Sequence, residues 1–256
     1  MNTKILIILL FLFLSKISLA GTMTVSGNTD DYCMSRSSVP DVFDGLVFRV
    51  TLNQGTSSAV RDVSGYGANG TITGAIWVNV DGRRCLRFDG IDDHSDFGDP
   101  PDGHLDFGTG SFSFGCWYNP TSIVANTYIM DKTSGTGYSI YINNGNGAVA
   151  AYTNWASYDL TSIGTIGTGT WSLLYVTVDQ SNYPSQGTIR TYNNGIQIST
   201  SVSFGSSSNS NAGNLFFGRY VGGGYSNGYL DEVRIYNRAL SNAEVAQIYN
   251  ATNGNL

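Results

Sequence analysis

Hydrophobic and polar residues alternate in short runs over most of the chain, and turn-forming residues separate the runs. Alternation with a period of two is typical of half-buried β-strands, and Gly, Asn, Asp and Ser favour the turns between them. Such runs predict strands at residues 46–52, 75–80, 85–88, 112–118, 128–130, 138–142, 148–152, 171–178, 188–192, 196–198, 215–217 and 229–236. About a dozen short strands with regular turns indicate an antiparallel β-sandwich.

The segment 112–118 shows the alternation clearly. Large apolar side chains stand at every second position, namely Phe112, Phe114, Cys116 and Tyr118. Because successive side chains of a strand point to opposite faces, this pattern predicts a strand with one face in the core.

The period changes near the C-terminus. Leu240, Val245 and Ile248 recur at helical spacing, and Ser241 with Glu244 three residues later forms a capping box. The chain is therefore expected to be all-β with one short C-terminal helix.

The first twenty residues read as a secretory signal peptide. Lys4 precedes an apolar run at residues 5–14, and small residues at Ser18 and Ala20 suit signal-peptidase cleavage. The run is too short to span a membrane, although an uncleaved anchor is the alternative. No later stretch reaches spanning length, so no membrane span is expected after leader removal. The mature protein is expected to be secreted, periplasmic or extracellular, with residues 21–43 as a polar extension or linker.

Charge narrows the range of partners. The chain carries 13 Lys and Arg against 19 Asp and Glu, and loss of Lys4 and Lys16 with the leader shifts the net charge from −6 to about −8. An acidic chain without a basic cluster argues against nucleic acid and anionic membrane surfaces as partners.

Three cysteines, Cys33, Cys85 and Cys116, allow one disulfide in an oxidising compartment and leave one thiol over. Their spacing does not say which two pair.

Five segments, in order along the chain, resemble one family. They are Asp62–Gly70 with its Asp-x-Ser-Gly turn, Leu86–Asp93 with Phe-Asp-Gly, Phe112–Trp117, Tyr192–Gly195, and Gly228–Asn250. Together they resemble the laminin-G-like jellyroll domains of the concanavalin A-like lectin/glucanase superfamily. The resemblance implies an antiparallel jellyroll β-sandwich, here over residues 44–251, and because this fold hosts many functions it settles none of them.

The resemblance also implies a structural calcium ion between the early Asp turn and the last strand. Carried over by motif position, Asp62, a carbonyl near Gly65, Asn69 and Asp231 are the candidate ligands. Arg49 lies where the family often has an acidic residue, so one ligand is in doubt. The alternative is that Asp62 and Asn69 only close their turn by side-chain hydrogen bonds.

A second acidic stretch, residues 89–106, contains seven Asp and both histidines of the chain. It lacks the closing Glu of an EF-hand, and most of its Asp are expected to terminate turns. His94 stands where the family commonly has an aromatic residue, so packing in an edge strand is expected for it.

Aromatic residues beside polar ones are the candidate ligand-binding groups, because aromatic faces pack on sugar C–H patches while polar neighbours bind hydroxyls. Two groups qualify: Tyr152, Trp155 and Tyr158 in one polar segment, and Arg219, Tyr220 and Tyr225 around a glycine-rich loop. Trp117 and Trp171 lie in core-like strands instead.

Catalysis is not expected. Glycoside hydrolysis usually needs a carboxylate pair, and the only two glutamates are Glu232, in the last strand, and Glu244, in the capping box. No Gly-x-Ser-x-Gly elbow accompanies His94 or His104. The chain is therefore expected to be an exported binding module, and the superfamily resemblance implies a glycan or glycoprotein as its ligand. A protein–protein adhesion or assembly module, or a divergent glycoside hydrolase, is the alternative.

Overall fold

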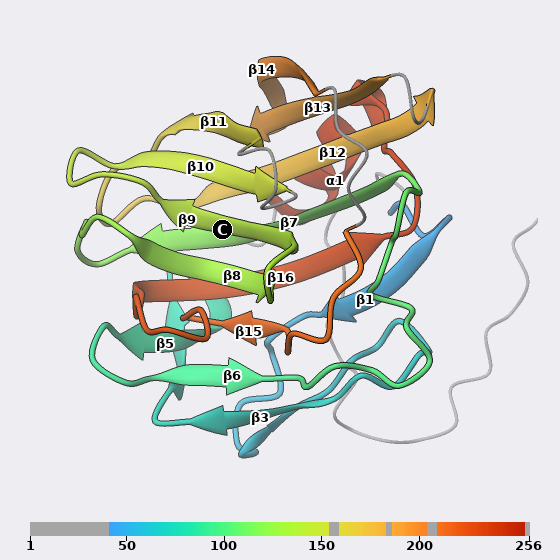
Figure 1. Cartoon of the computed structure of the whole chain (residues 1–256). Helices are drawn as coiled ribbons and strands as arrows, with labels where there is room; N and C mark the ends of the chain where they lie inside the picture. Colours follow the sequence, from blue (N-terminus) through green and yellow to red (C-terminus); the bar gives the residue numbers. More distant parts are fainter. Residues whose placement is uncertain (1–40, 154–158, 183–185, 204–208, 254–256) are drawn as a thin grey trace, which may run out of the picture. The chain divides into compact units, whose positions relative to one another are not determined.

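Two antiparallel β-sheets pack face to face in the computed structural model, and one helix follows the last strand (Figure 1). The structure describes residues 41–153, 159–182, 186–203 and 209–253, which belong to one unit spanning residues 34–256. This architecture confirms the expected antiparallel sandwich with a short C-terminal helix. Within the described ranges, no helix has the length and apolar character needed to cross a membrane.

The sheet that carries the helix, called here the helix-side sheet, has the strand order β14-β13-β12-β7-β16-β5-β4, and β1 also pairs with β16. Its strands are β1 (Leu46–Val50), β4 (Ile76–Val80), β5 (Arg83–Asp89), β7 (Phe112–Pro120), β12 (Ser172–Asn182), β13 (Gln186–Asn193), β14 (Ile196–Ser203) and β16 (Asn227–Tyr236).

The second sheet, which faces the viewer in Figure 1 and is called here the front sheet, has the order β11-β10-β9-β8-β15-β6-β3-β2. Its strands are β2 (Ala59–Val60), β3 (Gly70–Thr73), β6 (His94–Asp96), β8 (Thr127–Thr133), β9 (Gly137–Ile142), β10 (Ala148–Thr153), β11 (Asp159–Thr165) and β15 (Phe216–Phe217).

Two tight turns fix the register of their hairpins. Asp81 and Gly82 join β4 to β5, and Asn194 and Gly195 join β13 to β14; all four residues have positive φ, between 52° and 82°. Asp-Gly and Asn-Gly tolerate this conformation, and their twist matches that of the flanking strands. The strands predicted at 75–80 and 85–88, and those predicted at 188–192 and 196–198, thus pair as hairpins.

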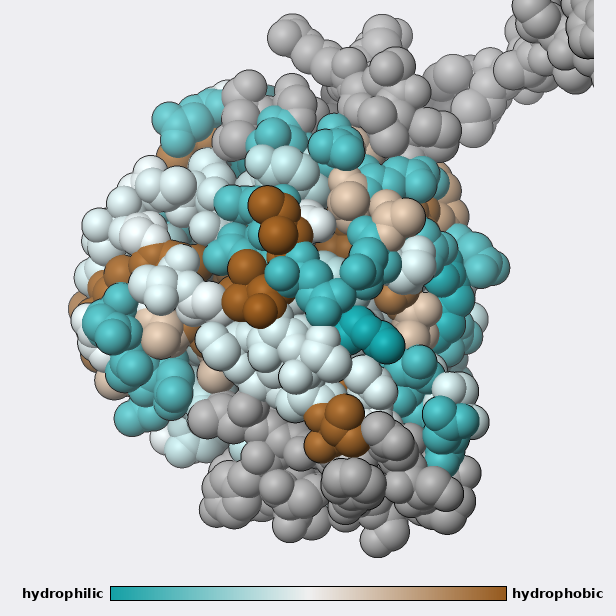
Figure 2. All heavy atoms as spheres, turned by 90° about the horizontal axis from the view of Figure 1, so that it is seen from above, coloured by the Kyte–Doolittle hydropathy of each residue, from teal (hydrophilic) through white to brown (hydrophobic). Residues whose placement is uncertain are grey.

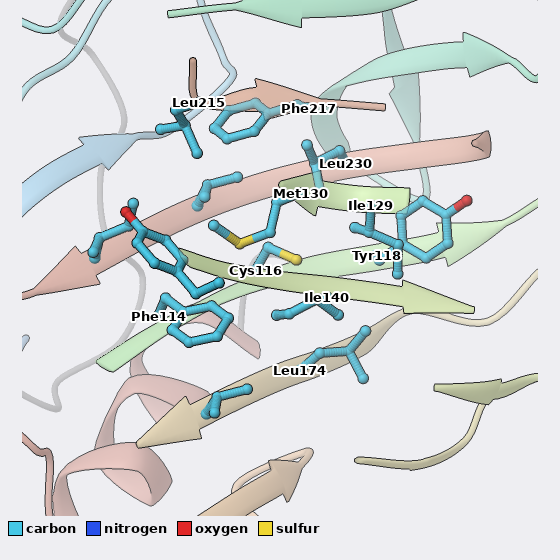
Figure 3. Close-up of a cluster of buried hydrophobic side chains, with 14 of the residues drawn as sticks. Phe114, Cys116, Tyr118, Ile129, Met130, Ile140, Leu174, Leu215, Phe217 and Leu230 are labelled. Atoms are coloured by element: carbon cyan, nitrogen blue, oxygen red, sulfur yellow. The ribbon is translucent and has the colours of Figure 1, made fainter. Parts of the chain in front are cut away.

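The main core lies between the sheets. Side chains from both inner faces meet there: Phe114, Cys116, Tyr118, Leu174 and Leu230 come from the helix-side sheet, and Ile129, Met130, Ile140 and Phe217 come from the front sheet (Figure 3). Alternate residues contribute along β7 and β9, as the period of two predicts, whereas a β-bulge in β8 sends the consecutive Ile129 and Met130 inward.

Strand β7 has its predicted face in the core, and its other face is buried too. Phe114 and Cys116 face the inter-sheet core, whereas Trp117 belongs to a second cluster on the other side of the sheet. Helix α1 (Asn242–Asn253) supplies Val245 and Ile248 to that second cluster. The predicted core face is confirmed, and the opposite face is buried as well because the helix covers it.

The predicted capping box opens α1. Glu244 Oε2 accepts a hydrogen bond from the Ser241 backbone N–H at 2.8 Å, and the Glu244 N–H donates to Ser241 Oγ at 3.3 Å. Hydrogen bonding to Arg238 holds the pKa of Glu244 down at about 2, so the cap is charged at neutral pH. Glu244 is thus committed to the helix start, as predicted.

The cysteines in the described part of the chain are free thiols. Cys85 lies in the cluster under the helix, and Cys116 lies in the core between the sheets. They face opposite sides of one sheet, which excludes a disulfide between them. Burial raises the pKa of Cys85 to about 12, so this thiol stays protonated and unreactive. Cys33 lies outside the described residues.

The packed domain starts before residue 44. Val42 is buried in the cluster under the helix, and Asp41 forms ion pairs with Arg49 and Arg234. These two residues, expected to belong to a linker, are part of the fold because their contacts lie on strands far along the chain.

Candidate functional site

The two sheets differ in what covers their outer faces. On the helix-side sheet, Leu240, Val245 and Ile248 pack over Trp117 and Trp171 and close that face. Among the described residues, no helix lies over the outer face of the front sheet, which is turned toward the viewer in Figure 1. The front sheet therefore offers the face on which a ligand can bind.

Strand register brings one row of side chains together on that face. Tyr152 of β10 lies opposite Ser139 of β9, which lies opposite Asp131 of β8. Asp131 lies opposite Phe216 of β15, which in turn lies opposite Asp96 of β6. Directly opposite residues share a face, so these five side chains form a continuous row across five strands.

A parallel row of tyrosines runs beside it. Tyr141 of β9 lies opposite Tyr128 of β8, and their rings stack with centroids 5.0 Å apart. The Tyr220 ring contacts Tyr128 on the side facing away from Tyr141, and the two ring centroids are 4.6 Å apart. Tyr141 and Tyr152 are only 8% and 7% exposed, so these two side chains are buried and pack beneath the more exposed ones. Tyr128, Tyr220 and Tyr225 are half-buried and can meet a ligand.

The loop that carries Tyr220 and Tyr225 is tied to strand β8. The Tyr128 N–H donates to the Gly224 carbonyl at 2.8 Å, and Tyr220 and Gly223 exchange two backbone hydrogen bonds. A Cβ at Gly224, where φ is +64°, would lie 2.6 Å from the Asn126 carbonyl. Only glycine permits this approach, so the sequence itself fixes the loop against the tyrosine row.

Arg219 and His94 complete the surface. The Arg219 guanidinium lies 4.8 Å from the Phe216 ring centroid and 5.6 Å from that of Tyr225. Its Nε and Nη2 donate to the carbonyls of Tyr220 and Val221, each at 3.1 Å. The His94 ring centroid lies 6.2 Å from that of Phe216. Arg219 thus holds the loop and the rings in place. We call Tyr128, Tyr141, Tyr152, Phe216, Tyr220, Tyr225, Arg219 and His94 the aromatic surface.

Asp131 is the buried acid under this surface. It is fully buried, and its carboxylate accepts hydrogen bonds from the hydroxyl and N–H of Thr133. Burial raises the pKa of Asp131 to about 7, because desolvation disfavours the charged form. Burial also raises the pKa of Tyr128 to about 12, so this phenol is a neutral donor and acceptor at physiological pH.

Comparison with known proteins identifies the family of this chain. Residues 89–246, more than half of the chain, match the Laminin_G_3 family, described as the concanavalin A-like lectin/glucanases superfamily. The chain belongs to this superfamily. None of the curated proteins matches it.

Solved structures of the superfamily fold include toxin binding domains. The binding domain of Paraclostridial Mosquitocidal Protein 1 shares 19% sequence identity with this chain, with a TM-score of 0.64. The match covers 81% of this chain and 52% of that chain. The binding domain of Botulinum Neurotoxin DC in complex with SialylT shares 16% identity with a TM-score of 0.64, covering 82% of this chain and 52% of that one. This superfamily member therefore spans about half the length of these toxin domains.

An enzyme-associated domain matches over its whole length. Domain 4 of a GH43 extracellular arabinanase from Geobacillus stearothermophilus, in complex with arabinotriose, shares 18% identity with a TM-score of 0.60. The match covers 80% of this chain and 98% of that domain.

Four of the six ligand-binding residues expected from the sequence come together on the aromatic surface of this superfamily member. They are Tyr152, Arg219, Tyr220 and Tyr225. Trp155 and Tyr158 lie outside the described residues. Tyr152 lies on β10, in agreement with the strand predicted at 148–152, and β10 continues to Thr153.

Sequence reasoning missed Tyr128, Tyr141, Phe216 and Asp131 as members of the surface. Alternation with the inward Ile140 was a signal for Tyr141, but none existed for Tyr128, which a β-bulge before Met130 turns outward. His94 was expected at a sheet edge; instead, β6 lies between β15 and β3, and the ring packs beside Phe216 and Tyr225.

The calcium ligands expected from the superfamily resemblance fall into two places. Asp62 accepts hydrogen bonds from the N–H groups of Arg49, Ser64, Gly67 and Ala68 at 2.9–3.1 Å, and from the Ser64 hydroxyl at 2.8 Å. N–H donors aimed at the carboxylate suit a turn better than a cation. This set does not fit a calcium ion as it is arranged here.

The other expected ligands are also committed to protein partners. Asn69 Oδ1 accepts a hydrogen bond from the Asp62 N–H at 2.9 Å. Asp231 pairs with the Arg83 guanidinium at 2.7 Å under the helix. Gly65 has positive φ within the Asp62 turn. Asp62, Gly65 and Asn69 thus share one turn, while Asp231 belongs to the cluster under the helix.

In the described ranges, one group of three acidic side chains has oxygen atoms within 4.8 Å of one another: Asp89, Asp92 and Asp93. Asp93 accepts a hydrogen bond from the Asp89 N–H, and Asp89 accepts one from the Ile91 N–H. Burial raises the pKa of Asp93. As expected for this stretch, its carboxylates close turns; the group lies next to His94, whose Nδ1 is 2.8 Å from the Asp92 carbonyl.

The acidic side chains of the front sheet do not form an acid–base pair. Asp131 and Asp96 stand on either side of Phe216 in one row, about 10 Å apart by strand spacing. Phe216 separates them, and Asp96 accepts hydrogen bonds from Asn214 and the Gly98 N–H. Glu232 pairs with Arg49 and Arg234. Asp96, Asp131 and Glu232 are thus each engaged by protein partners in this geometry.

Proposed function

We propose that this chain is a non-catalytic carbohydrate-binding module and that it binds its ligand on the aromatic surface of the front sheet. The observation that carries the proposal is the register that places Tyr128, Tyr220, Tyr225 and Arg219 together on the uncovered face. Aromatic rings pack against sugar C–H groups, and neutral phenols exchange hydrogen bonds with hydroxyls.

Similar structures support this proposal to different degrees. The arabinanase domain in complex with arabinotriose is matched over 98% of its length, so nearly the whole of that domain resembles this chain. The toxin binding domains are matched over 52%, so their ligands need not contact the matched half. The arabinanase domain is thus the stronger support for a sugar ligand.

Export fits the proposed function. The leader expected at residues 1–20 would deliver the module to a secreted, periplasmic or extracellular location, where glycans and glycoproteins are encountered. Cleavage after Ala20 is tested by mass spectrometry of the protein recovered from the medium or periplasm.

We expect Tyr220→Ala to lower glycan affinity about tenfold or more without lowering the melting temperature. Tyr220 is half-buried, lies at the end of the tyrosine row and contributes its ring rather than a core contact. Loss of one stacked aromatic contact of about 1.4 kcal/mol gives a tenfold change. Binding is measured by calorimetry with the best ligand from a glycan array.

Tyr66→Ala is the matched control, because Tyr66 is 49% exposed and contacts His104 away from the aromatic surface. Equal losses in the Tyr66 and Tyr220 variants, or unchanged binding in the Tyr220 variant, would place the site elsewhere.

The alternative of a protein–protein adhesion module has one observation in its favour. Strand β14, at the edge of the helix-side sheet, exposes Ile196, Ile198 and Val202. In Figure 2, which looks down on the end of the molecule where β14 lies, hydrophobic residues form small separate patches among polar ones. Separate patches of this kind are ordinary for a protein surface, so the aromatic surface remains the better candidate.

Structural calcium remains a prediction of the superfamily resemblance. If Asp62 and its neighbours bound the ion, chelation would lower the melting temperature and added Ca²⁺ would restore it, by the linkage between binding and folding. The hydrogen bonds that Asp62 already accepts lead us to expect no shift. A shift of several degrees that is absent in Asp62→Asn would establish the site.

A further inference from the structure

We propose that the aromatic surface selects neutral glycans and discriminates against acidic ones such as sialylated or uronic-acid chains. This inference rests on the proposed function and specifies the ligand class of the same site. It follows from where the charged side chains lie around the surface.

Two arginines are the cations to consider there: Arg219, and Arg87 of β5, whose charge acts on Asp93. The chain has three lysines: Lys4 and Lys16 lie in the expected leader, and Lys132 is fully buried on the inner side of the front sheet. Lys132 Nζ is held by Asp99 at 2.9 Å and by Asp106 at 3.0 Å. No lysine in the described part of the chain is therefore free to meet a sugar acid at this surface.

Arg219 is the arginine that contacts the rings of the surface, and its Nε–Nη2 edge already holds the loop. Nε and Nη2 donate to the Tyr220 and Val221 carbonyls, and the guanidinium face lies against Phe216 and Tyr225. Bidentate recognition of a carboxylate needs two parallel N–H groups from one guanidinium. The Nε–Nη2 edge of Arg219 cannot supply them without releasing the loop that it holds, which leaves only its Nη1–Nη2 end for an acid, beside the carboxylates of the acidic edge.

Negative charge, by contrast, gathers along the same edge of the site. Asp89, Asp92 and Asp93 lie within 4.8 Å of one another immediately before His94, and Asp92 is exposed. Asp96 follows two residues later on the outer face, bound to Asn214 rather than to a cation. These carboxylates repel an approaching sugar acid, and because Asp92 is at the surface, salt should screen the repulsion.

A neutral sugar meets no such barrier. The half-buried rings of Tyr220 and Tyr225 offer packing surface, and the Tyr128 phenol stays uncharged as both donor and acceptor. Hydroxyl groups can also donate to carboxylates such as Asp92. The charges that repel an acid thus assist a polyol.

The test compares glycans that differ only in charge. An array of sialylated glycans and their desialylated counterparts, with galacturonic-acid oligosaccharides beside galactose oligosaccharides of equal length, is probed with the protein from residue 21 onward. Calorimetry follows for the best pair. We expect the neutral member to bind at least about tenfold more tightly than the acidic one at low salt, and the gap to narrow at 0.5 M NaCl.

Variants assign the discrimination to the named charges. Asp92→Asn should narrow the affinity gap between neutral and acidic ligands, because it removes a repelling charge while the asparagine oxygen can still accept a hydrogen bond from a sugar hydroxyl. Asp81→Asn is the matched control: it removes one exposed negative charge at the β4–β5 turn of the helix-side sheet, and asparagine tolerates the positive φ found there. This control variant should leave the affinity difference between neutral and acidic ligands unchanged.

The outcomes separate the two proposals. Acidic glycans that bind as tightly as neutral ones, through a site abolished by Tyr220→Ala, would overturn the charge selection and leave the carbohydrate-binding function standing. An equal effect of Asp92→Asn and Asp81→Asn would contradict the assignment to the acidic edge. Absence of binding to glycans of either kind would overturn both proposals.

Discussion

Asp131→Asn is expected to stabilise the protein at pH 8 by up to about 4 kcal/mol while changing its stability little near pH 4. Burial raises the pKa of Asp131 from 3.8 to about 7, and each pKa unit corresponds to ~1.4 kcal/mol. Because the folded-state pKa lies above the unfolded value, the stabilising effect of the protonated form is fully present below pH 3.8. It is lost as the pH rises through 7, where the buried carboxylate must ionise.

Asparagine keeps the contacts and removes the charge. Its side-chain oxygen can still accept from the Thr133 N–H and hydroxyl. Its amide can donate toward Ser139 on the neighbouring strand, whose buried Oγ has no hydrogen-bond partner within the described structure. Urea denaturation of both proteins at pH 5 and pH 8 measures the difference.

Asp179→Asn is the control of opposite sign. Hydrogen bonds from Ser181 lower the pKa of Asp179, so its ionised form is the favoured one in the folded state. That variant should lose a little stability at pH 8. An Asp131→Asn variant whose stability parallels that of the wild type at every pH would show that Asp131 is not desolvated in the fold.

Arg83→Met is expected to destabilise the protein by about 3–5 kcal/mol, because it leaves a buried carboxylate without its partner. The Arg83 guanidinium donates to Asp231 at 2.7 Å and to the Thr252 carbonyl at 2.9 Å. It also lies 4.5 Å from the Trp117 ring centroid. One side chain therefore joins β5, β7, β16 and the end of the helix.

The double variant Arg83→Met/Asp231→Leu tests the reason for that loss. When both charges are removed, the desolvation cost disappears with the pair, so the double variant should recover a large part of the stability. Urea denaturation of the two single variants and the double variant gives the coupling. A double variant that is no more stable than Arg83→Met would show that packing on Trp117, rather than the ion pair, explains the effect.

Local sequence patterns were enough to predict most of the fold. Asp81-Gly82 and Asn194-Gly195 specify tight turns through positive φ, and the Ser241–Glu244 capping box marks the helix start. These signals act over two to four residues, so they are legible without knowing what packs where. The three-residue strand β6 carries no such signal because His94, Ser95 and Asp96 are all polar.

The candidate site could be predicted only in part, because sheet order brings it together. Phe216 lies opposite both Asp131 and Asp96, since the two-residue strand β15 is inserted between β8 and β6. Nothing local near residue 131 announces a partner so far along the chain. The same holds for Asp231, which the motif resemblance named as a calcium ligand and which instead pairs with Arg83, 148 residues away.

Both ends of the described domain are anchored on the side away from the aromatic surface. Asp41 binds Arg234 of β16, and the Thr252 hydroxyl accepts a hydrogen bond from Trp117 Nε1 beneath the helix. If a tag, a solid support or a neighbouring polypeptide is joined at either position, it therefore attaches to the domain on the helix side. An immobilised or fused copy would present the tyrosine row outward, as an array of such modules on a surface requires.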